Sequence, residues 1–307
     1  MIVSWNVRDL LRMCIASIES TQDTLSAQII VVDNGSDDGS AEAIRREFPW
    51  VELIASQTNL GFARANNLGL NLATGRYVFF LNPDTVLEEG ALNRMIGFME
   101  RHDEFDVVGP KLVSPDGRGQ WVCARRLPSA RLLLFQALYL HRLPLVGERL
   151  WNRMCAYYDL NESQEVEAIS GAAILARRTT IEDLGGFDEM FLHTGEDVDL
   201  CRRLRDRGSK IFYLAEATVV HFGGQSSSQV WARSGTMAIL STEMYLVRFH
   251  GRLHALMYRL VVQLVQMPIM VMVGLGKAFL RRDGRHDLRQ RLDLAKSIWH
   301  WRKSELR

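Results

Sequence analysis

The 307-residue sequence has no excess of either charge and few cysteines. Lys and Arg number 37 and Asp and Glu number 36, so the chain shows no overall basic character of the kind that binds nucleic acid. The four cysteines, Cys14, Cys123, Cys155 and Cys201, lie far apart and form no C-x-x-C pair. Neither a zinc knuckle nor a redox pair is indicated, and a reducing cytoplasm suits the chain.

A full-length apolar span, a signal peptide and internal repeats are also missing. The uncharged run Leu260–Gly276 has 17 residues, whereas a bilayer span needs roughly 20. Met1 is followed directly by the strand-like Ile2–Trp5 instead of the basic and apolar regions of a signal peptide, which predicts an active part on the cytoplasmic side. Because 47% of the residues are apolar, the chain is expected to bury a substantial core.

The first hundred residues alternate between strand-like and helix-like segments. Such alternation with short connections predicts an α/β fold, a Rossmann-like and mostly parallel sheet flanked by helices. Ligands of these sheets bind at the carboxyl ends of the strands. The expected strands are Ile2–Trp5, Ile29–Val32, Val51–Ala55 and Tyr77–Leu81, and the expected helices are Arg8–Ser20, Ala41–Phe48 and Ala63–Ala73.

The pattern is less regular beyond Asp106. Acids at the start of Gly195–Gly208, bases at its end and the closing glycine predict a helix. The other expected elements are a hairpin from Val107–Val113 through the Pro115-Asp-Gly turn, a helical or loop insertion at Ser129–Leu145, a strand at Ala168–Ala176, a helix at Arg178–Leu184 and two strands at Lys210–Leu214 and Ala217–His221.

Polar residues follow each of the first four expected strands. They are Ser4 and Asn6, then the segment from Asp33 to Ser40, then Asn59 and Gly61, then Asn82 and Asp84. Taken singly, each is ordinary turn and capping chemistry. Their coincidence on one edge of a parallel sheet favours a ligand site there.

A nucleoside diphosphate sugar is a ligand that these residues suit. Asp33 can accept a hydrogen bond from a pyrimidine N–H, and Gly35 and Gly61 let the backbone approach a ligand closely. Arg64, at a helix start, can meet a phosphate or the edge of the base.

A diphosphate leaving group needs its developing charge neutralised, most simply by a divalent cation. Asp84 and His221 are the candidate ligands, and oxygen plus imidazole suits Mn²⁺ better than Mg²⁺. Glu196 and Asp197 are paired carboxylates at a helix start, where one of them can deprotonate an acceptor hydroxyl. The alternatives are a structural histidine and a solvated helix N-terminus, where acids such as Asp199 are expected.

With these residues assembled, the chain resembles the family 2 inverting glycosyltransferases of the GT-A fold, especially their rhamnosyltransferase-like branch. The resemblance covers Ile2 to about Ser228 and rests on motifs that occur in the expected order. These are V-S-W-N at Val3, V-V-D-N-G-S-D-D-G-S at Val31, N-L-G-F-A-R-A-N-N at Asn59, L-N-P-D at Leu81, and G-E-D-V-D-L-C-R-R at Gly195 followed by H-F-G-G-Q-S.

The resemblance implies roles for individual residues. Asp33 would bind the base, Asp84 and His221 would bind the metal, and Asp197 would be the catalytic base of the E-D pair. Ser170 and Gly171 would line the sugar pocket. The segment Gly223–Ser228 would lie near the diphosphate.

The implied reaction is a single displacement with inversion. The donor is a nucleotide-diphosphate sugar, with dTDP-rhamnose as the candidate, and the acceptor is a hydroxyl of a polysaccharide or of a lipid-linked saccharide. Two features depart from the family: Asn82 replaces the first acid of the D-x-D turn, and the chain begins inside the family's first strand. They leave open a catalytically impaired member that binds sugar nucleotide or acts as a scaffold. A nucleotidyltransferase would open with a glycine-rich phosphate loop, which residues 5–9 do not form.

A catalytic domain is expected over residues 1–229, with a nucleotide-binding half at about 1–110 and an acceptor and catalytic half at about 111–229. A helical region is expected at 230–307. Within it, Arg259, Gln263 and Gln266 form a polar stripe, and Pro268 is expected to interrupt the helix.

Charge is concentrated in the last segment. Residues 281–307 carry a net charge of +5 and residues 1–280 a net charge of −4. A basic end after an apolar stretch favours peripheral contact with the anionic inner face of the cytoplasmic membrane. The alternative is a helical hairpin packed on the catalytic domain or on a second subunit of a homodimer.

Overall fold

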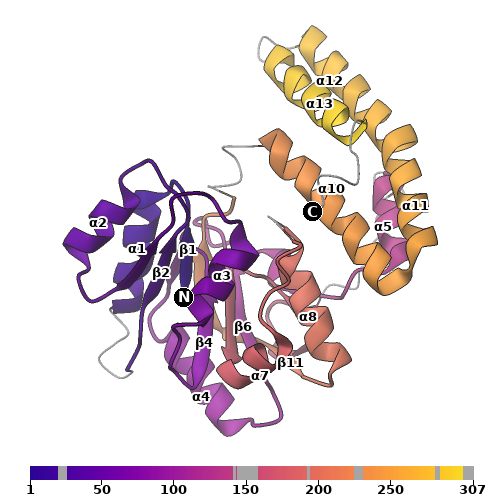
Figure 1. The fold of residues 1–307 in the computed structure, drawn as a ribbon. Helices are drawn as coiled ribbons and strands as arrows, with labels where there is room; N and C mark the ends of the chain where they lie inside the picture. Colours follow the sequence, from indigo (N-terminus) through magenta and orange to yellow (C-terminus); the bar gives the residue numbers. More distant parts are fainter. Residues whose placement is uncertain are drawn as a thin grey trace. The chain divides into compact units, whose positions relative to one another are not determined.

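The computed structural model describes residues 1–19, 26–140, 143, 158–191, 194–224, 231–280 and 284–299 (Figure 1). The chain divides into two compact units. Unit 1 comprises Met1–Leu127, Tyr157–Leu192 and Glu196–Ser226, and unit 2 comprises Pro128–Ala156, His193–Gly195 and Ser227–Arg307. Ser20, the end of the expected insertion at Leu145, Cys155 and most of the expected diphosphate loop lie outside the described residues.

Unit 1 is built on a mixed sheet whose strand order is β3-β2-β1-β4-β10-β6-β11-β5, with β8 paired to β11. β1 pairs in parallel with β2 and β4, and β10 is antiparallel to both β4 and β6. The strands are β1 (Ile2–Ser4), β2 (Ile30–Asp33), β3 (Glu52–Ala55), β4 (Tyr77–Leu81), β5 (Thr85–Leu87), β6 (Val107–Val113), β8 (Gln164–Val166), β10 (Ala173–Arg177) and β11 (Ile211–His221). A second sheet pairs β7 (Ala124–Arg125) with β9 (Ala168–Ile169).

Helices cover both faces of the sheet, as the alternating pattern predicts. Leu11, Cys14 and Ile15 are fully buried on one face of α1 because they recur at helical spacing. They join Ile2 and the α4 side chains in one core cluster. The helices of unit 1 are α1 (Arg8–Glu19), α2 (Ser40–Glu47), α3 (Phe62–Leu70), α4 (Ala91–Arg101), α7 (Arg178–Leu184) and α8 (Glu196–Asp206).

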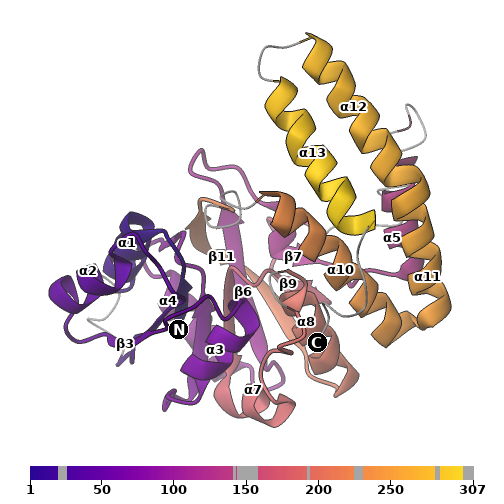
Figure 2. The same cartoon turned by 45° about the horizontal axis from the view of Figure 1, so that its top comes forward.

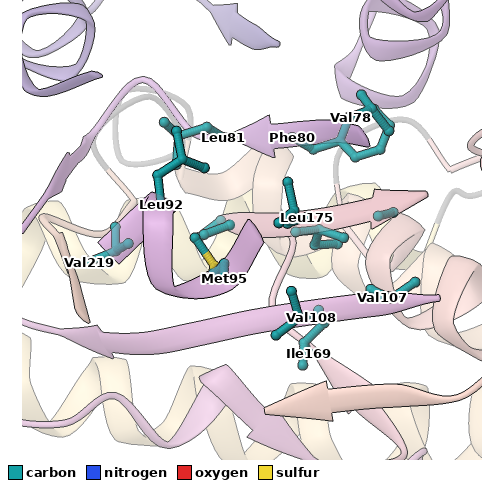
Figure 3. Close-up of a cluster of buried hydrophobic side chains, with 14 of the residues drawn as sticks. Val78, Phe80, Leu81, Leu92, Met95, Val107, Val108, Ile169, Leu175 and Val219 are labelled. Atoms are coloured by element: carbon teal, nitrogen blue, oxygen red, sulfur yellow. The ribbon is translucent and has the colours of Figure 1, made fainter. Parts of the chain in front are cut away.

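Side chains along β1 and β2 point alternately to the two faces of the sheet, so each face packs against a different helix. Ile2 and Val31 belong to the large cluster with α1, whereas Val3 and Val32 pack with Ala65 of α3. Figure 3 shows the centre of the large cluster, where Met95 of α4 lies among β4, β6 and β10. The predicted α/β fold class is therefore confirmed.

Two strand predictions need correction. The expected strand Ala168–Ala176 is broken at Ser170–Ala172, so that its halves join different sheets. Conversely, the two strands expected at Lys210–Leu214 and Ala217–His221 form one strand, β11. A register shift between Leu214 and Thr218 lets both parts pair with β6. The expected hairpin after β6 returns by a single bridge from Val113 to Gly119.

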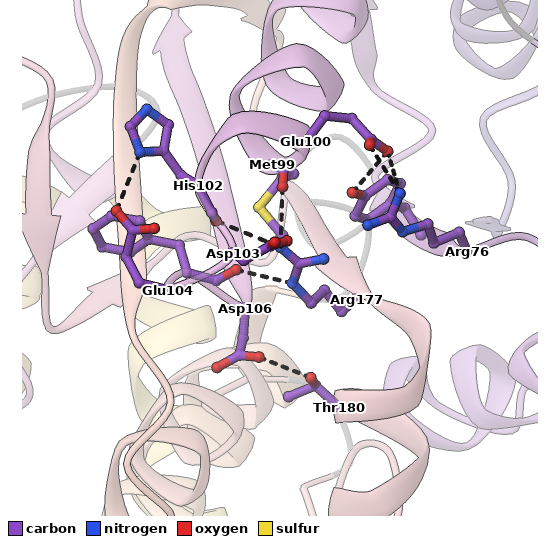
Figure 4. A network of polar contacts seen from close by, with 11 residues as sticks. Arg76, Met99, Glu100, His102, Asp103, Glu104, Asp106, Arg177 and Thr180 are labelled. Atoms are coloured by element: carbon purple, nitrogen blue, oxygen red, sulfur yellow. Dashed lines mark hydrogen bonds and ion pairs between the residues drawn. The ribbon is translucent and has the colours of Figure 1, made fainter.

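The strand directions show where the polar residues that follow the first four strands lie; their edge of the sheet is called here the polar rim. Since β10 is antiparallel to both β4 and β6, and β11 is parallel to β6, the carboxyl ends of β1, β2, β4, β6 and β11 share one edge, where β10 begins. The opposite edge carries a structural network (Figure 4). There Arg177 donates to the backbone oxygens of Met99 and Phe105 and pairs with Asp103.

Unit 2 is helical (Figure 2). Its helices are α5 (Ala130–Ala137), α10 (Trp231–His250), α11 (Arg252–Val261), a π-helical turn η4 (Val262–Gln266), α12 (Met267–Leu280) and α13 (Gly284–Trp299). They share a core to which Ala130, Leu246, Tyr258, Met267 and Leu294 contribute.

Pro268 does not interrupt the helix as expected. The chain stays helical from Arg252 to Leu280. The residues before Pro268 form a π-helical turn in which Met267 N–H donates to Val262 O. The wider turn accommodates the proline ring and its missing donor.

Candidate active site

The loops after β1, β2 and β3 are tied together by Asn34, Asn6 and their partners. Asn34 N–H donates to Ser4 O at 2.8 Å, and its side chain accepts from Leu60 N–H at 2.7 Å and donates to Asn59 Oδ1 at 3.1 Å. Asn6 N–H donates to Ser36 Oγ at 3.0 Å. These bonds fix the rim without any ligand.

Two polar atoms on this rim are buried and lack a partner within the described part of the chain. They are Asp33 Oδ1 and Ser4 Oγ, on residues that are 3% and 0% exposed. Ser4 and Asp33 are register partners on β1 and β2, so their side chains lie on the same face. The other carboxylate oxygen, Oδ2, accepts from Ser36 N–H at 3.2 Å. A buried acceptor beside a hydroxyl suits the N–H and C=O edge of a nucleobase.

Glycines let the rim loops approach each other. Gly35 has φ +77°, and a Cβ there would lie 2.8 Å from the carbonyl carbon of Thr58. Gly61, at φ +83°, precedes the first residue of α3, and Asn59 Oδ1 accepts its N–H at 2.9 Å. Arg64 lies exposed in the first turn of α3.

The L-N-P-D turn lies between two other site segments. Asn82 N–H donates to Ala172 O at 2.9 Å, which joins the turn to the Ser170–Ala172 break. On the other side, Thr85 pairs with His221, and Phe222 N–H donates to Asp84 O at 2.9 Å. The backbone therefore brings Asp84 and His221 together, as the sequence predicts.

Their side chains face each other across 3.4 Å, from His221 Nε2 to Asp84 Oδ1. Gln120 Nε2 donates to His221 O at 2.7 Å, so Gln120 Oε1 is turned toward His221 Nδ1, 2.8 Å away. Nδ1 therefore carries a proton and donates to Gln120 Oε1, and Nε2 is the ring nitrogen that faces the carboxylate. Nε2 is buried without a hydrogen-bond partner among the described residues.

A divalent cation bound between His221 Nε2 and Asp84 Oδ1 would satisfy both atoms. Asp84 and His221 thus fit a divalent metal with Gln120 as the residue that orients the imidazole. Within the described ranges, His, Cys, Asp and Glu side chains form no cluster of three or more that would hold a metal. The protein would supply two ligands at this site, and a bound diphosphate would have to supply others.

Asp197 is held by three donors. Its Oδ2 accepts from Arg125 at 2.6 Å and from Gly171 N–H at 3.0 Å, and its Oδ1 accepts from Val198 N–H at 2.8 Å. Glycine at position 171 favours this approach, since a Cβ there would lie 3.1 Å from Asp197 Cβ. Ser170 closes the same turn by accepting from Ala172 N–H. These bonds fix the carboxylate, and Oδ1 keeps capacity to accept a further proton or hydrogen bond.

The neighbouring acids of α8 have different environments. Glu196 is buried, and burial together with the charge of Asp197 raises its pKa to about 8. Asp199 is fully buried and paired with Arg203 at 2.6 Å, which gives it a structural role. Only Asp197 of the three accepts from the Ser170–Gly171 turn.

The sequence-based reasoning missed two residues of this site. Gln120 contacts His221 across 101 positions of the chain, and Arg125 contacts Asp197 across 72. Neither belongs to a recognisable motif. A cavity of about 570 Å³ lies elsewhere in unit 1, lined by Ser163 and by residues of α4 and β11 such as Asn93 and Phe212, and none of the predicted site residues lines it.

Comparison with known proteins identifies relatives. The chain is 28% identical over 235 residues to the N-acetylglucosaminyl-diphospho-decaprenol L-rhamnosyltransferase of Mycobacterium tuberculosis, covering 73% of this chain and 75% of that protein. It is 31% identical over 198 residues to the pre-mycofactocin glycosyltransferase of the same species, covering 63% of this chain and 37% of that one.

Solved structures share the fold. The mannosyltransferase PcManGT from Pyrobaculum calidifontis, in complex with GDP-Man and Mn²⁺, aligns with a TM-score of 0.55 at 16% identity, over 97% of this chain and 86% of that one. Staphylococcus aureus TarS 1–349 aligns with a TM-score of 0.51 at 14% identity, over 97% and 90%. The sequence model of glycosyl transferase family 2 matches residues 1–184, and the chain therefore belongs to that family of glycosyltransferases.

Proposed function

We propose that this chain transfers a sugar from a nucleoside-diphosphate donor to a hydroxyl of a polysaccharide or lipid-linked acceptor, with inversion at the anomeric carbon. Asp197 acts as the base, and a divalent cation, Mn²⁺ or Mg²⁺, binds at Asp84 and His221. The observation that carries the proposal is the 3.4 Å approach of two buried acceptors, Asp84 Oδ1 and His221 Nε2, at the strand edge where donors bind.

The protein's own residues position the reactants. Asp33 and Ser4 offer their unpartnered atoms to the nucleobase of the donor, with Asn6, Asn59, Gly61 and Arg64 around it. Asn82 supplies a neutral oxygen beside Asp84, for the ribose or for water. When bound, the cation would neutralise the charge that develops on the departing diphosphate.

Asp197 performs the proton transfer. Its Oδ1 takes the proton of the acceptor hydroxyl while the hydroxyl oxygen forms its bond to the anomeric carbon and the bond to the diphosphate breaks. Arg125 and Gly171 N–H hold Oδ2, so the carboxylate keeps one orientation during the step. Attack from the face opposite the leaving group gives inversion.

The donor we favour is dTDP-rhamnose, because one relative is named as an L-rhamnosyltransferase of N-acetylglucosaminyl-diphospho-decaprenol. That relative also supports a lipid-linked acceptor, which would place the reaction at the cytoplasmic face of the membrane.

A donor panel tests the proposal. The purified chain is incubated with dTDP-rhamnose, UDP- and GDP-sugars and a lipid-linked N-acetylglucosamine acceptor, with Mn²⁺, with Mg²⁺ or with EDTA, and release of nucleoside diphosphate and product stereochemistry are measured. We expect transfer from one donor, with inversion and loss in EDTA. Full activity in EDTA would overturn the metal role, and retention of configuration would overturn the single displacement.

A binding-only protein is the second candidate. It is favoured by the Arg125 ion pair, since a guanidinium 2.6 Å from Asp197 Oδ2 already occupies that carboxylate oxygen. Such a protein would bind the sugar nucleotide in calorimetry but release no nucleoside diphosphate with any acceptor of the panel.

A further inference from the structure

The helix of unit 2 that runs from Arg252 to Leu280 is apolar on its outer side. Large apolar side chains recur every three or four residues along it and are exposed. Leu253 is 68% exposed, Leu264 63% and Met272 61%. The exposed residues of this stripe, called here the outer stripe, are Leu253, Leu256, Met257, Leu260, Leu264, Pro268, Met272, Val273 and Leu275.

The opposite side of the same helix is already packed. Ala255, Tyr258, Val262 and Met267 lie in the core of unit 2, and α11 and α12 contact α10, α5 and α13. Among the described residues, Arg252–Gly276 is one helical stretch long and apolar enough to cross a membrane, yet 22% of its most apolar window is buried in protein. An apolar helix face needs cover, and within the described part of the chain only the inner side of this helix has it.

Arg259 argues against a transmembrane position. It is the eighth residue of the stretch Arg252–Gly276 and forms an ion pair with Glu243 of α10, so a span over this stretch would carry the pair into the bilayer. Charged groups at that depth are costly. A helix lying flat, with the outer stripe inserted and the inner side packed on protein, avoids that cost.

The charge of the segment indicates which surface it meets. Residues 244–282 contain no Asp or Glu and six Lys or Arg. Arg248 and Arg252 are exposed next to the start of the outer stripe, and Arg289 and Lys296 are exposed on α13, which contacts α12. Asp293 is also exposed on α13, so the stripe is flanked by an excess of cations and not by cations alone, and such a surface complements anionic lipid headgroups.

We propose that the outer stripe is a docking surface for an anionic lipid bilayer, in which the helix lies in the plane of the interface and does not span. Leu256, Leu260 and Leu264 enter the acyl region, and Arg248 and Arg252 remain at the headgroups. The proposal adds a lipid bilayer as a partner of the proposed glycosyltransferase. It rests on the proposed function in one respect, the choice of the cytoplasmic leaflet as the surface that is bound.

Vesicle flotation tests the docking surface without measuring catalysis. The full chain is floated with phosphatidylcholine vesicles and with phosphatidylcholine–phosphatidylglycerol vesicles. We expect binding about tenfold or more tighter to the anionic vesicles, weakened by added salt. Leu256→Glu/Leu264→Glu should weaken it roughly a hundredfold, since two apolar insertions are lost and two negative charges are added.

Matched variants keep the result interpretable. Met13→Glu/Leu72→Glu changes two exposed apolar residues of unit 1 and should float like the unmodified chain. Leu256→Gln/Leu264→Gln removes the apolar groups without adding charge and should also reduce flotation. Thermal melting shows that each variant is folded.

Several results would overturn the proposal. One is failure of the folded chain to float with anionic vesicles, and another is equal flotation of the stripe and unit 1 variants. A third is a dimer in light scattering that Leu256→Glu/Leu264→Glu converts to monomer while vesicle binding stays unchanged, because a second copy would then cover the stripe. Loss of glycosyl transfer with intact flotation would count against the proposed function and not against this surface.

Discussion

The carboxylate of Asp197 accepts hydrogen bonds from Arg125, Gly171 and Val198, so its position is set before any substrate binds. Asp197→Asn keeps the shape but cannot take a proton. We expect kcat to fall by about 10²–10⁴-fold, with donor affinity in calorimetry changed little. Retained turnover would show that another group is the base.

Gln120 donates to the backbone oxygen of His221 and accepts from the ring at Nδ1. Gln120→Leu frees the ring and its tautomer, so we expect Mn²⁺ affinity, measured by calorimetry with nucleoside diphosphate present, to fall by about 10–100-fold. Gln28→Leu, a glutamine that bonds Glu52 and Thr74, is the matched control. Equal affinity in the two variants would deny Gln120 this role.

Glu196 has a pKa of about 8, raised from 4.5 by burial and by Asp197. Between pH 4.5 and pH 8 this group binds more protons in the folded chain than in the unfolded chain. Its contribution to the free energy of unfolding therefore falls as the pH rises, by at most about 1.4 kcal/mol per pH unit. The loss begins near pH 4.5 and is complete above pH 8.

Glu196→Gln removes this titration. Denaturant unfolding from pH 5 to pH 8 should therefore show a stability difference between variant and unmodified chain that grows in favour of the variant with pH. A constant difference across this range would mean that Glu196 ionises normally.

At the scale of elements, the β2–α2 loop depends on Gly35. Gly35→Ala would combine a positive φ with a Cβ 2.8 Å from Thr58. Gly117→Ala is the matched control, since Gly117 has φ +81° and nothing within 4 Å of its Cβ position. We expect Gly117→Ala to cost about 1–2 kcal/mol in denaturant unfolding and Gly35→Ala about 1–3 kcal/mol more, with weaker donor binding. Equal costs would show that the Thr58 backbone yields.

Elements with a regular local pattern were predictable from the sequence. The prediction for β4 agrees with the structure at Tyr77–Leu81, and that for α7 agrees at Arg178–Leu184, because each is a periodic segment between clear turn residues. The break at Ser170–Ala172 was not predicted, because Ser170 and Gly171 are small residues inside an otherwise apolar run of strand length. Only the pairing of its two halves with β7 and β4 separates them.

The site was predictable in part for the same reason. Asp84 and His221 were paired correctly because each follows a strand whose carboxyl end lies on the shared edge. Gln120 and Arg125 carry no local signal, and their roles arise only when distant segments meet. Pro268 was misjudged because one added residue in a π-helical turn cancels its usual effect.

At the scale of the whole molecule, donor and metal should stabilise the chain together. In the proposed site the protein would offer two metal ligands, Asp84 and His221, and the diphosphate would have to complete the set. We expect Mn²⁺ alone to change Tm little, and nucleoside diphosphate with Mn²⁺ to raise it more than the sum of the separate shifts. Tight Mn²⁺ binding to the free protein would contradict a site shared with substrate.

Unit 2 takes α5 from the middle of the sequence and α10 to α13 from its end. Ala130 and Ala137 of α5 have their core partners in the C-terminal helices, more than a hundred residues later. During synthesis α5 therefore leaves the ribosome long before the helices that cover it exist. For the same reason a chain cut near residue 230 is not a self-sufficient catalytic fragment, because it retains an apolar helix whose natural cover has been removed.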